Sequence, residues 1–247
     1  YFFRFFHNIH LHKLMTQEIN IQEISQKLYT KVKDKGWDKL RTFLLSSDMD
    51  DILEKLVKEV EQGKRFTPPV KNVFKALEVC PLDTVKVVIV GQDPYPQFNV
   101  ADGIAFSCST TGKIEKSLKY MHDSIKDTVD VGYVGNADLL PWSEQGVLLI
   151  NSAFTTTIGK PGTHQELWQP FTAFLLDILV HRKQNLVYVF LGKKAQEFAD
   201  MIPDDNYKIM VSHPASAAYN GSKWDCNDMW NKINKHLEEN GQSPISW

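Results

Sequence analysis

The chain has 247 residues, of which 43% are hydrophobic and 23% are charged, as expected for a globular protein with one substantial core. Its 28 basic and 30 acidic residues leave a net charge of -2, which excludes a strongly basic protein held on nucleic acid by its overall charge. No apolar run approaches the roughly 18 residues that a membrane-spanning helix needs. Three cysteines without a C-x-x-C pair favour neither a disulfide framework nor a zinc site. We therefore expect a reducing, intracellular location, in the cytoplasm or the nucleus.

The N-terminal quarter of the chain is predicted to be helical. We treat residues 1–16 as an N-terminal extension, either disordered or derived from cloning, and expect a single domain over residues 17–247. Apolar residues three and four positions apart predict helices at 28–37, 40–47 and 49–62. After an extended segment at 66–69, the same spacing predicts a helix over 70–80.

Four short apolar runs then alternate with helical patterns. The runs at 86–90, 147–150, 186–191 and 208–211 are rich in Val, Ile and Leu, as in strands covered on both faces. Helices are predicted between them at 116–128, 167–183 and 193–201. This alternation predicts an α/β fold, with a central four-stranded parallel doubly wound sheet flanked by helices.

Polar residues stand directly after each of these predicted strands. In chain order, they are Asp93, Asn151, the pair Lys193 and Lys194, and His213. An Asp before a Pro, or a single Asn or His after a strand, is usually a turn or capping residue. Ligands of an open parallel sheet bind beyond the carboxyl ends of its strands, so the same placement in all four loops predicts a functional site there.

Several common enzyme classes lack their characteristic motifs in this chain. The sequence has no G-x-G-x-x-G, no G-x-x-x-x-G-K-[ST], no H-E-x-x-H and no G-x-S-x-G. Dinucleotide-binding, P-loop, zinc-protease and serine-hydrolase functions are therefore disfavoured.

A series of motifs resembles one enzyme family in order along the chain. VKVVIVGQDPYP, DGIAFS, VLLINSAFT, VSHPASAAY and the terminal GQSPISW are similar to the motifs of family 1 uracil-DNA glycosylases. These enzymes flip uracil out of DNA and hydrolyse the bond between the base and its sugar, leaving an abasic site. The resemblance implies this activity, a monofunctional DNA-repair role and no cofactor.

The resemblance also assigns site residues. Asp93 would activate the attacking water, and His213 would stabilise the departing uracil anion. Tyr95 would exclude a 5-methyl group and so reject thymine. Asn151 would read the Watson-Crick edge of the base, because a carboxamide both donates and accepts hydrogen bonds. The implied uracil-binding set is Gln92, Tyr95, Phe106 and Asn151.

Two loops depart from the family pattern. Pro96 replaces the His of the family's GQDPYH motif, and the HPSPLS loop becomes residues 213–218, in which Ala217 takes the place of a leucine that fills the vacated base stack. We therefore expect a strong preference for single-stranded uracil DNA, unless Tyr219 substitutes as the wedge. The predicted DNA contacts are Ser117, Lys193, Lys194, Ser216, Ala217 and Tyr219, with Lys113, Lys116, Lys160 and Lys223 as possible additions to a basic face.

Two alternatives remain open at this level. One is a related glycosylase that excises another damaged base. The other is a non-catalytic DNA-binding or replication-scaffold protein that retains the fold. The expected partner is uracil-containing DNA, single-stranded or double-stranded, bound by a monomer, and an inhibitor protein or a replication partner is a further possibility.

Overall fold

The computed structural model describes residues 19–220 and 222–247, without the side chains of residues 218–220. The predicted N-terminal extension at 1–16 lies outside the described residues, and so does the side chain of Tyr219. Within the described part of the chain, no helix is both long enough and apolar enough to cross a membrane.

Helices and strands alternate along the second half of the chain. The strands are β1 (Phe66–Thr67), β2 (Val87–Gly91), β3 (Val147–Asn151), β4 (Thr156–Thr157), β5 (Val187–Leu191) and β6 (Tyr207–Val211). The α-helices are α1 (Ile21–Val32), α2 (Arg41–Leu44), α3 (Ser47–Glu61), α4 (Lys75–Val79), α5 (Lys116–Thr128), α6 (Leu140–Glu144), α7 (Gln165–Arg182), α8 (Lys193–Gln196), α9 (Ala215–Asn220) and α10 (Met229–Glu239). Short 3-10 turns occupy Lys33–Lys35, Asp38–Leu40, Val70–Asn72, Leu82–Thr84 and Ala199–Met201.

The central sheet has four parallel strands in the order β3-β2-β5-β6, which confirms the predicted sheet. Successive strands β2 and β3 are neighbours, whereas β5 lies on the opposite side of β2. The chain therefore reverses its winding direction at β2, and such a switch point is where open α/β sheets bind ligands.

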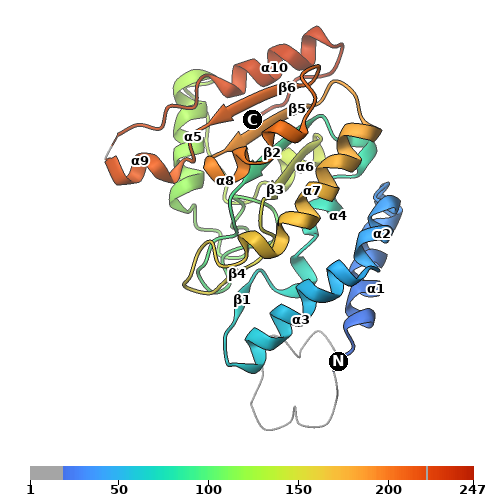
Figure 1. The fold of residues 1–247 in the computed structure, drawn as a ribbon. Helices are drawn as coiled ribbons and strands as arrows, with labels where there is room; N and C mark the ends of the chain where they lie inside the picture. Colours follow the sequence, from blue (N-terminus) through green and yellow to red (C-terminus); the bar gives the residue numbers. More distant parts are fainter. Residues whose placement is uncertain (1–18, 221) are drawn as a thin grey trace.

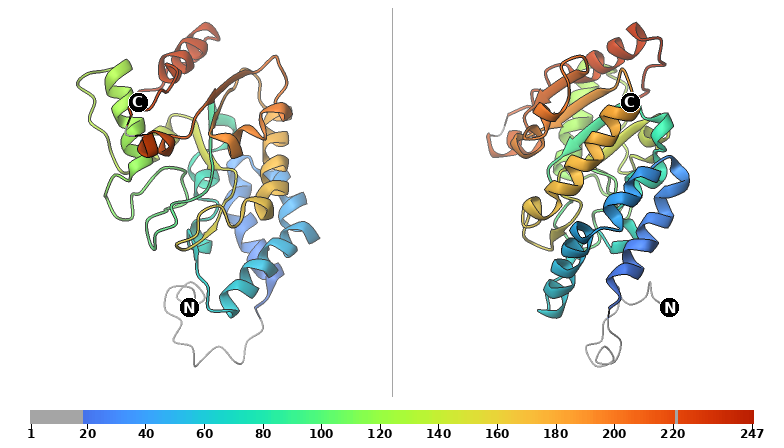
Figure 2. Two further views of the ribbon diagram at one scale, coloured as in Figure 1. Left: turned by 60° about the vertical axis from the view of Figure 1, so that its left-hand side comes forward. Right: turned by 45° about the vertical axis from the view of Figure 1, so that its right-hand side comes forward.

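Both faces of this sheet are buried, because alternate strand residues enter two different cores. Val88, Ile150 and Tyr188 pack with α1, α2, α3, α4 and α7, whereas Ile89 and Leu149 pack with α5, α6 and α10. Figures 1 and 2 show the resulting three layers, with α10 and α5 on one side of the sheet and α7 and the N-terminal helices on the other. Burial on both faces explains why the strands are continuous apolar runs.

The structure corrects several element boundaries. The pattern at 28–37 is the end of α1 followed by a 3-10 turn, because Gly36 adopts a left-handed conformation with φ 80°. The predicted helix at 70–80 is a 3-10 turn followed by the five residues of α4, and the one at 193–201 is α8 followed by another 3-10 turn. Helices α6, α9 and α10 were not predicted, nor was the small antiparallel sheet formed by β1 and β4.

Candidate active site at the end of the sheet

The loop that follows β2 carries Gln92 and Asp93, and backbone hydrogen bonds tie it to the end of β3. Ser152 and Ala153 donate their amides to the carbonyls of Gly91 and Gln92, both over 3.0 Å. The side chain of Gln165, at the start of α7, donates to the carbonyl of Gln92 over 2.8 Å. The position of this loop is therefore fixed by neighbouring elements on both sides.

The carboxylate of Asp93 is half-buried and held by a backbone donor. The Gly162 amide donates to its Oδ2 over 2.5 Å. Burial raises the pKa of Asp93 above its ordinary value, while hydrogen bonds from Gly162, Thr156 and Gln92 and the nearby His164 act in the opposite direction. In its ionised form, a partly desolvated carboxylate is suited to accept a proton or to stabilise a cation.

The segment that presents Gly162 is anchored by a buried hydrogen-bonded pair, His164 and Glu59, that sequence analysis did not single out. His164 is 1% exposed, its Nε2 lies 3.1 Å from Glu59 Oε2, and its Nδ1 lies 2.8 Å from the Thr155 hydroxyl. Burial would raise the pKa of Glu59, but the hydrogen bond and charge of His164, with a hydrogen bond from Thr157, hold it below its ordinary value. Glu59 lies on α3, which is remote in sequence, so no local pattern could have paired the two.

Asn151 and Phe106 meet over Gly91, the last residue of β2. Gly91 and Asn151 are register partners in the sheet. A Cβ atom at position 91 would lie 2.5 Å from Asn151 Oδ1 and 2.9 Å from Phe106 Cζ. Only a glycine therefore lets the carboxamide and the aromatic ring come together at this point.

Phe106 is held in an unusual backbone conformation by the loop that contains it. Its φ is 66°, a value that side-chain-bearing residues rarely adopt. Asp102, 1% exposed, organises this loop by accepting hydrogen bonds from Ile104 N, Ser109 N and the hydroxyl of Ser107. Sequence analysis did not single out Asp102, although it opens the DGIAFS motif.

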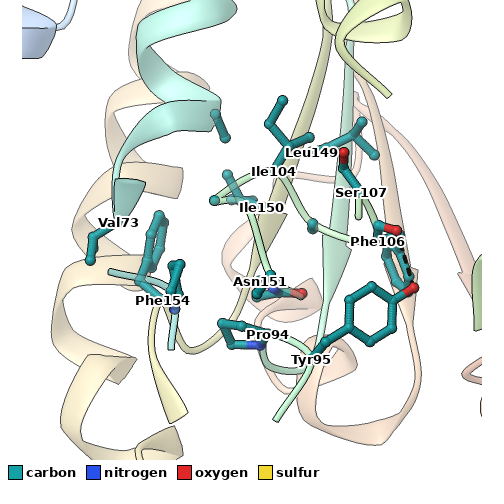
Figure 3. A pocket seen from close by; sticks show the side chains of 15 residues that line it. Val73, Pro94, Tyr95, Ile104, Phe106, Ser107, Leu149, Ile150, Asn151 and Phe154 are labelled. Carbon is teal, nitrogen blue, oxygen red and sulfur yellow. Dashed lines mark hydrogen bonds between the residues drawn. The ribbon is translucent and has the colours of Figure 1, made fainter. Parts of the chain in front are cut away.

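Tyr95 closes one side of the same space. Its hydroxyl donates to the carbonyl of Phe106 over 3.1 Å. Burial raises the pKa of Tyr95 well above its ordinary value, so the phenol stays neutral and keeps the proton for this bond. Figure 3 shows this bond and the side chains of Pro94, Tyr95, Phe106 and Asn151 around a common pocket.

His213 follows β6, and its imidazole packs against the ring of Phe106. The two ring centroids are 5.8 Å apart, with an angle of 34° between the planes. The Ala215 amide donates to His213 Nδ1 over 3.2 Å, so Nδ1 is the acceptor and a neutral ring carries its proton on Nε2. Burial lowers the pKa of His213 to about 4, so the imidazole is neutral at physiological pH.

The structure thus brings the predicted residues together as one set of contacts. Tyr95, Phe106 and Asn151 line the pocket, His213 packs against Phe106, and Gln92 and Asp93 follow directly on Gly91. The residues 19–220 and 222–247 contain no group of three or more His, Cys, Asp or Glu side chains placed to hold a metal ion. The three cysteines are buried and free.

Comparison with known proteins places this arrangement in a family. The family model described as Uracil DNA glycosylase superfamily matches residues 77–238. The chain belongs to the uracil DNA glycosylase superfamily. It is 34% identical over 234 residues to the uracil-DNA glycosylase of Acinetobacter baumannii, with 93% of this chain and 98% of that protein covered. These matches confirm the resemblance seen in the motifs.

Solved structures of the same family share the fold. The crystal structure of mimivirus uracil-DNA glycosylase superposes with a TM-score of 0.79 at 26% identity and covers 91% of this chain and 90% of that one. A variant of the mimivirus enzyme, in complex with the protein UGI, gives a TM-score of 0.77 at 25% identity over 94% of this chain and 97% of that one.

Of the residues predicted to contact DNA, some are exposed and others are buried. Lys193 and Lys194 are exposed at the start of α8, and Lys194 pairs with Glu197 over 2.8 Å. Gly192 lies so close to His213 that a Cβ there would be 2.8 Å from His213 Cβ, which places Lys193 directly beside the His213 loop. Ser117 is buried at the start of α5.

Ala217, at the predicted wedge position, is buried in this structure. It is 4% exposed and packs into the core beside α5 and α10, so its methyl group does not project from the surface. Ser216 is exposed in the same loop, and its amide donates to the carbonyl of His213 over 2.8 Å. Of the additional lysines, Lys223 pairs with Asp127 over 2.9 Å, whereas Lys113, Lys116 and Lys160 are exposed.

Proposed function

We propose that this protein removes uracil from DNA by hydrolysing the N-glycosidic bond, with Asp93 and His213 as the catalytic residues. The proposal rests on the family relationship and on the contacts that join Asn151, Phe106 and His213 beside the Asp93 loop. Asp93 and His213 are both present, which favours an enzyme over a non-catalytic DNA-binding protein.

Asp93 would act on the sugar side of the bond. As the C1′–N1 bond breaks, positive charge develops on the sugar, and a fixed carboxylate stabilises that charge more in the transition state than in the ground state. The water oxygen bonds to C1′, and Asp93 accepts the proton that the water loses. The Gly162 amide holds the carboxylate in position for both roles.

His213 would act on the base. The electron pair of the broken bond passes to uracil, so negative charge grows on the ring and its carbonyl oxygens. A neutral imidazole whose Nδ1 accepts from Ala215 offers its Nε2–H as a donor to that charge. The imidazole can donate this hydrogen bond to the leaving uracil in its neutral form, without becoming an imidazolium.

The pocket residues would determine which base is accepted. Phe106 would stack on the flipped base, Tyr95 would fill the space of a 5-methyl group, and Gln92 would line the pocket through its loop. Asn151 would pair with the edge of uracil through its carboxamide, whose oxygen lies over Gly91. Ser117, Lys193, Lys194 and Ser216 would contact the DNA backbone.

The substrate would be uracil-containing DNA, single-stranded or double-stranded, bound by a monomer in a reducing intracellular compartment. An inhibitor protein is a further candidate partner, because the related mimivirus variant is seen with UGI. The decisive experiment is release of free uracil from a uracil-containing oligonucleotide in the presence of a chelator. Release of a different damaged base, with uracil untouched, would favour the related-glycosylase alternative.

A further inference from the structure

Three exposed residues lie on segments next to the loop of Asp93, on a part of the surface that the mechanism does not use. They are Arg65 before β1, Phe98 after the GQDPYP motif, and Lys160 after β4. We call these three residues the loop rim. Phe98 is 58% exposed, although it lies only five residues beyond Asp93.

Backbone hydrogen bonds fix the three segments of the loop rim side by side. The Ile158 amide donates to the carbonyl of Arg65, and the Gly159 amide donates to the carbonyl of Pro96, both over 2.8 Å. The carbonyl of Lys160 accepts from the Thr156 hydroxyl over 2.9 Å. The segment at 158–160 therefore lies between the other two and is tied to both.

The same segment also reaches the candidate catalytic carboxylate. Gly162, two residues beyond Lys160, donates to Asp93 Oδ2 over 2.5 Å. The loop rim is thus continuous with the active site through the backbone. A strand whose uracil occupies the pocket would have its neighbouring nucleotides close to this surface.

The chemistry of the loop rim matches a nucleic-acid strand. Arg65 and Lys160 take part in none of the ion pairs found in the described part of the chain, so their charges are available to phosphates. A single exposed apolar residue is common on protein surfaces, but an exposed aromatic ring beside backbone segments that carry two exposed cations, next to the proposed DNA site, provides a base-stacking surface. Because the net charge of the protein is -2, binding to the DNA phosphates requires local cations such as these.

We propose that the loop rim binds the single strand next to the flipped uracil, with Phe98 stacked on a neighbouring base and Arg65 and Lys160 on phosphates. This inference rests on DNA being the substrate, as proposed above. The loop rim would bind unpaired DNA without a wedge residue at position 217, where Ala217 is buried. Phe98 is therefore proposed as a DNA-binding residue that takes no part in bond breaking.

The test measures binding separately from catalysis. Affinity for a single-stranded oligonucleotide with one uracil is measured by fluorescence anisotropy in an Asp93→Asn background, and kcat and KM for uracil release are measured in the parent background. Phe98→Ala should weaken binding about tenfold and raise KM similarly, with kcat nearly unchanged. Phe98→Tyr should restore both values, and Val134→Ala, at a position 86% exposed on the α5–α6 loop, is the matched control.

Two further comparisons identify the contact. Abasic spacers are placed one position at a time on both sides of the uracil, and the spacer that replaces the stacked base should abolish the effect of Phe98→Ala. Arg65→Ala and Lys160→Ala should each lower the slope of log affinity against log salt by about 0.7, whereas Lys126→Ala on α5 should not.

The outcomes separate this inference from the proposed function. If Phe98→Ala binds within twofold of the background protein, or if its effect survives every spacer, the loop rim does not stack on a base and the inference is overturned. If the parent releases no uracil while Phe98→Ala still loses affinity, the proposed function fails and the loop rim stands as a DNA-binding surface.

Discussion

Gly91 and Asn151 are paired across strands β2 and β3, and a Cβ at position 91 would lie 2.5 Å from the Asn151 carboxamide oxygen. The glycine is therefore needed for the pocket, since its lack of a side chain leaves the space that Asn151 and Phe106 share. Gly91→Ala should leave the sheet folded but displace both groups, because a methyl group cannot fit there without a shift of its neighbours.

We expect Gly91→Ala to lower the kcat/KM for uracil release by at least about tenfold, equivalent to about 1.4 kcal/mol of transition-state binding. Circular dichroism and a thermal melt establish that the variant is folded. Gly132→Ala is the control, because a Cβ there meets only the Asp130 carboxylate, with 3.3 Å to its Oδ1. Equal activity of Gly91→Ala and parent would mean that the carboxamide does not read the base from this position.

His213 should be neutral, with its proton on Nε2, throughout the neutral pH range. Burial lowers its pKa to about 4, and Nδ1 is occupied by the Ala215 amide. Nitrogen NMR of labelled histidine reports both the tautomer and the titration. An imidazolium at neutral pH, or a proton on Nδ1, would contradict the proposed donor role of this residue.

The pH dependence of activity follows from the same two groups. Asp93 must be ionised and its pKa is raised, so activity is present above that pKa and is lost as pH falls through it. The pKa of His213 is about 4 in the folded protein, whereas the pKa of an unfolded histidine is about 6.5. Folding stability should therefore also fall as pH decreases through that window. A kcat that instead declines as pH rises through neutrality would contradict this assignment.

The buried pair of Glu59 and His164 should matter for stability more than any exposed ion pair. Glu59→Gln removes the charge beside a histidine that is 1% exposed, so we expect a loss of about 1 to 3 kcal/mol in the free energy of unfolding. Glu54→Gln, on the same helix but in an exposed pair with Lys58, should cost less than about 1 kcal/mol. Equal losses in urea unfolding would show that the buried pair has no special role in holding the Gly162 segment.

Base selectivity is predicted to depend on Tyr95 and Asn151. Tyr95→Ala should permit weak release of thymine, since we propose that its ring fills the space of the 5-methyl group, and Asn151→Asp should permit release of cytosine. Chromatography of the released bases measures both. Thymine release by the parent protein, or unchanged preference in both variants, would place the selectivity elsewhere.

The sheet and the residues at its edge could be predicted because each depends on local sequence. Strand β2 is a buried apolar run, and Asp93 follows it within a motif shared with a known family. The partner of His164 could not be predicted, because Glu59 is 105 positions away and sits on an ordinary amphipathic helix. The burial of Ala217 could not be predicted either, because no local pattern in the sequence indicates the core residues that pack beneath α9. Helix α10 was missed although its apolar residues are regularly spaced.

In the proposed mechanism, Asp93 supplies the negative charge needed to break the glycosidic bond. The most direct test compares uracil release by the parent and by Asp93→Asn, on a single-stranded uracil oligonucleotide in the presence of EDTA and under single-turnover conditions. We predict release by the parent and a rate at least about 100-fold lower for the variant, with DNA affinity retained. An Asp93→Asn rate within about tenfold of the parent, a difference of about 1.4 kcal/mol, would contradict it.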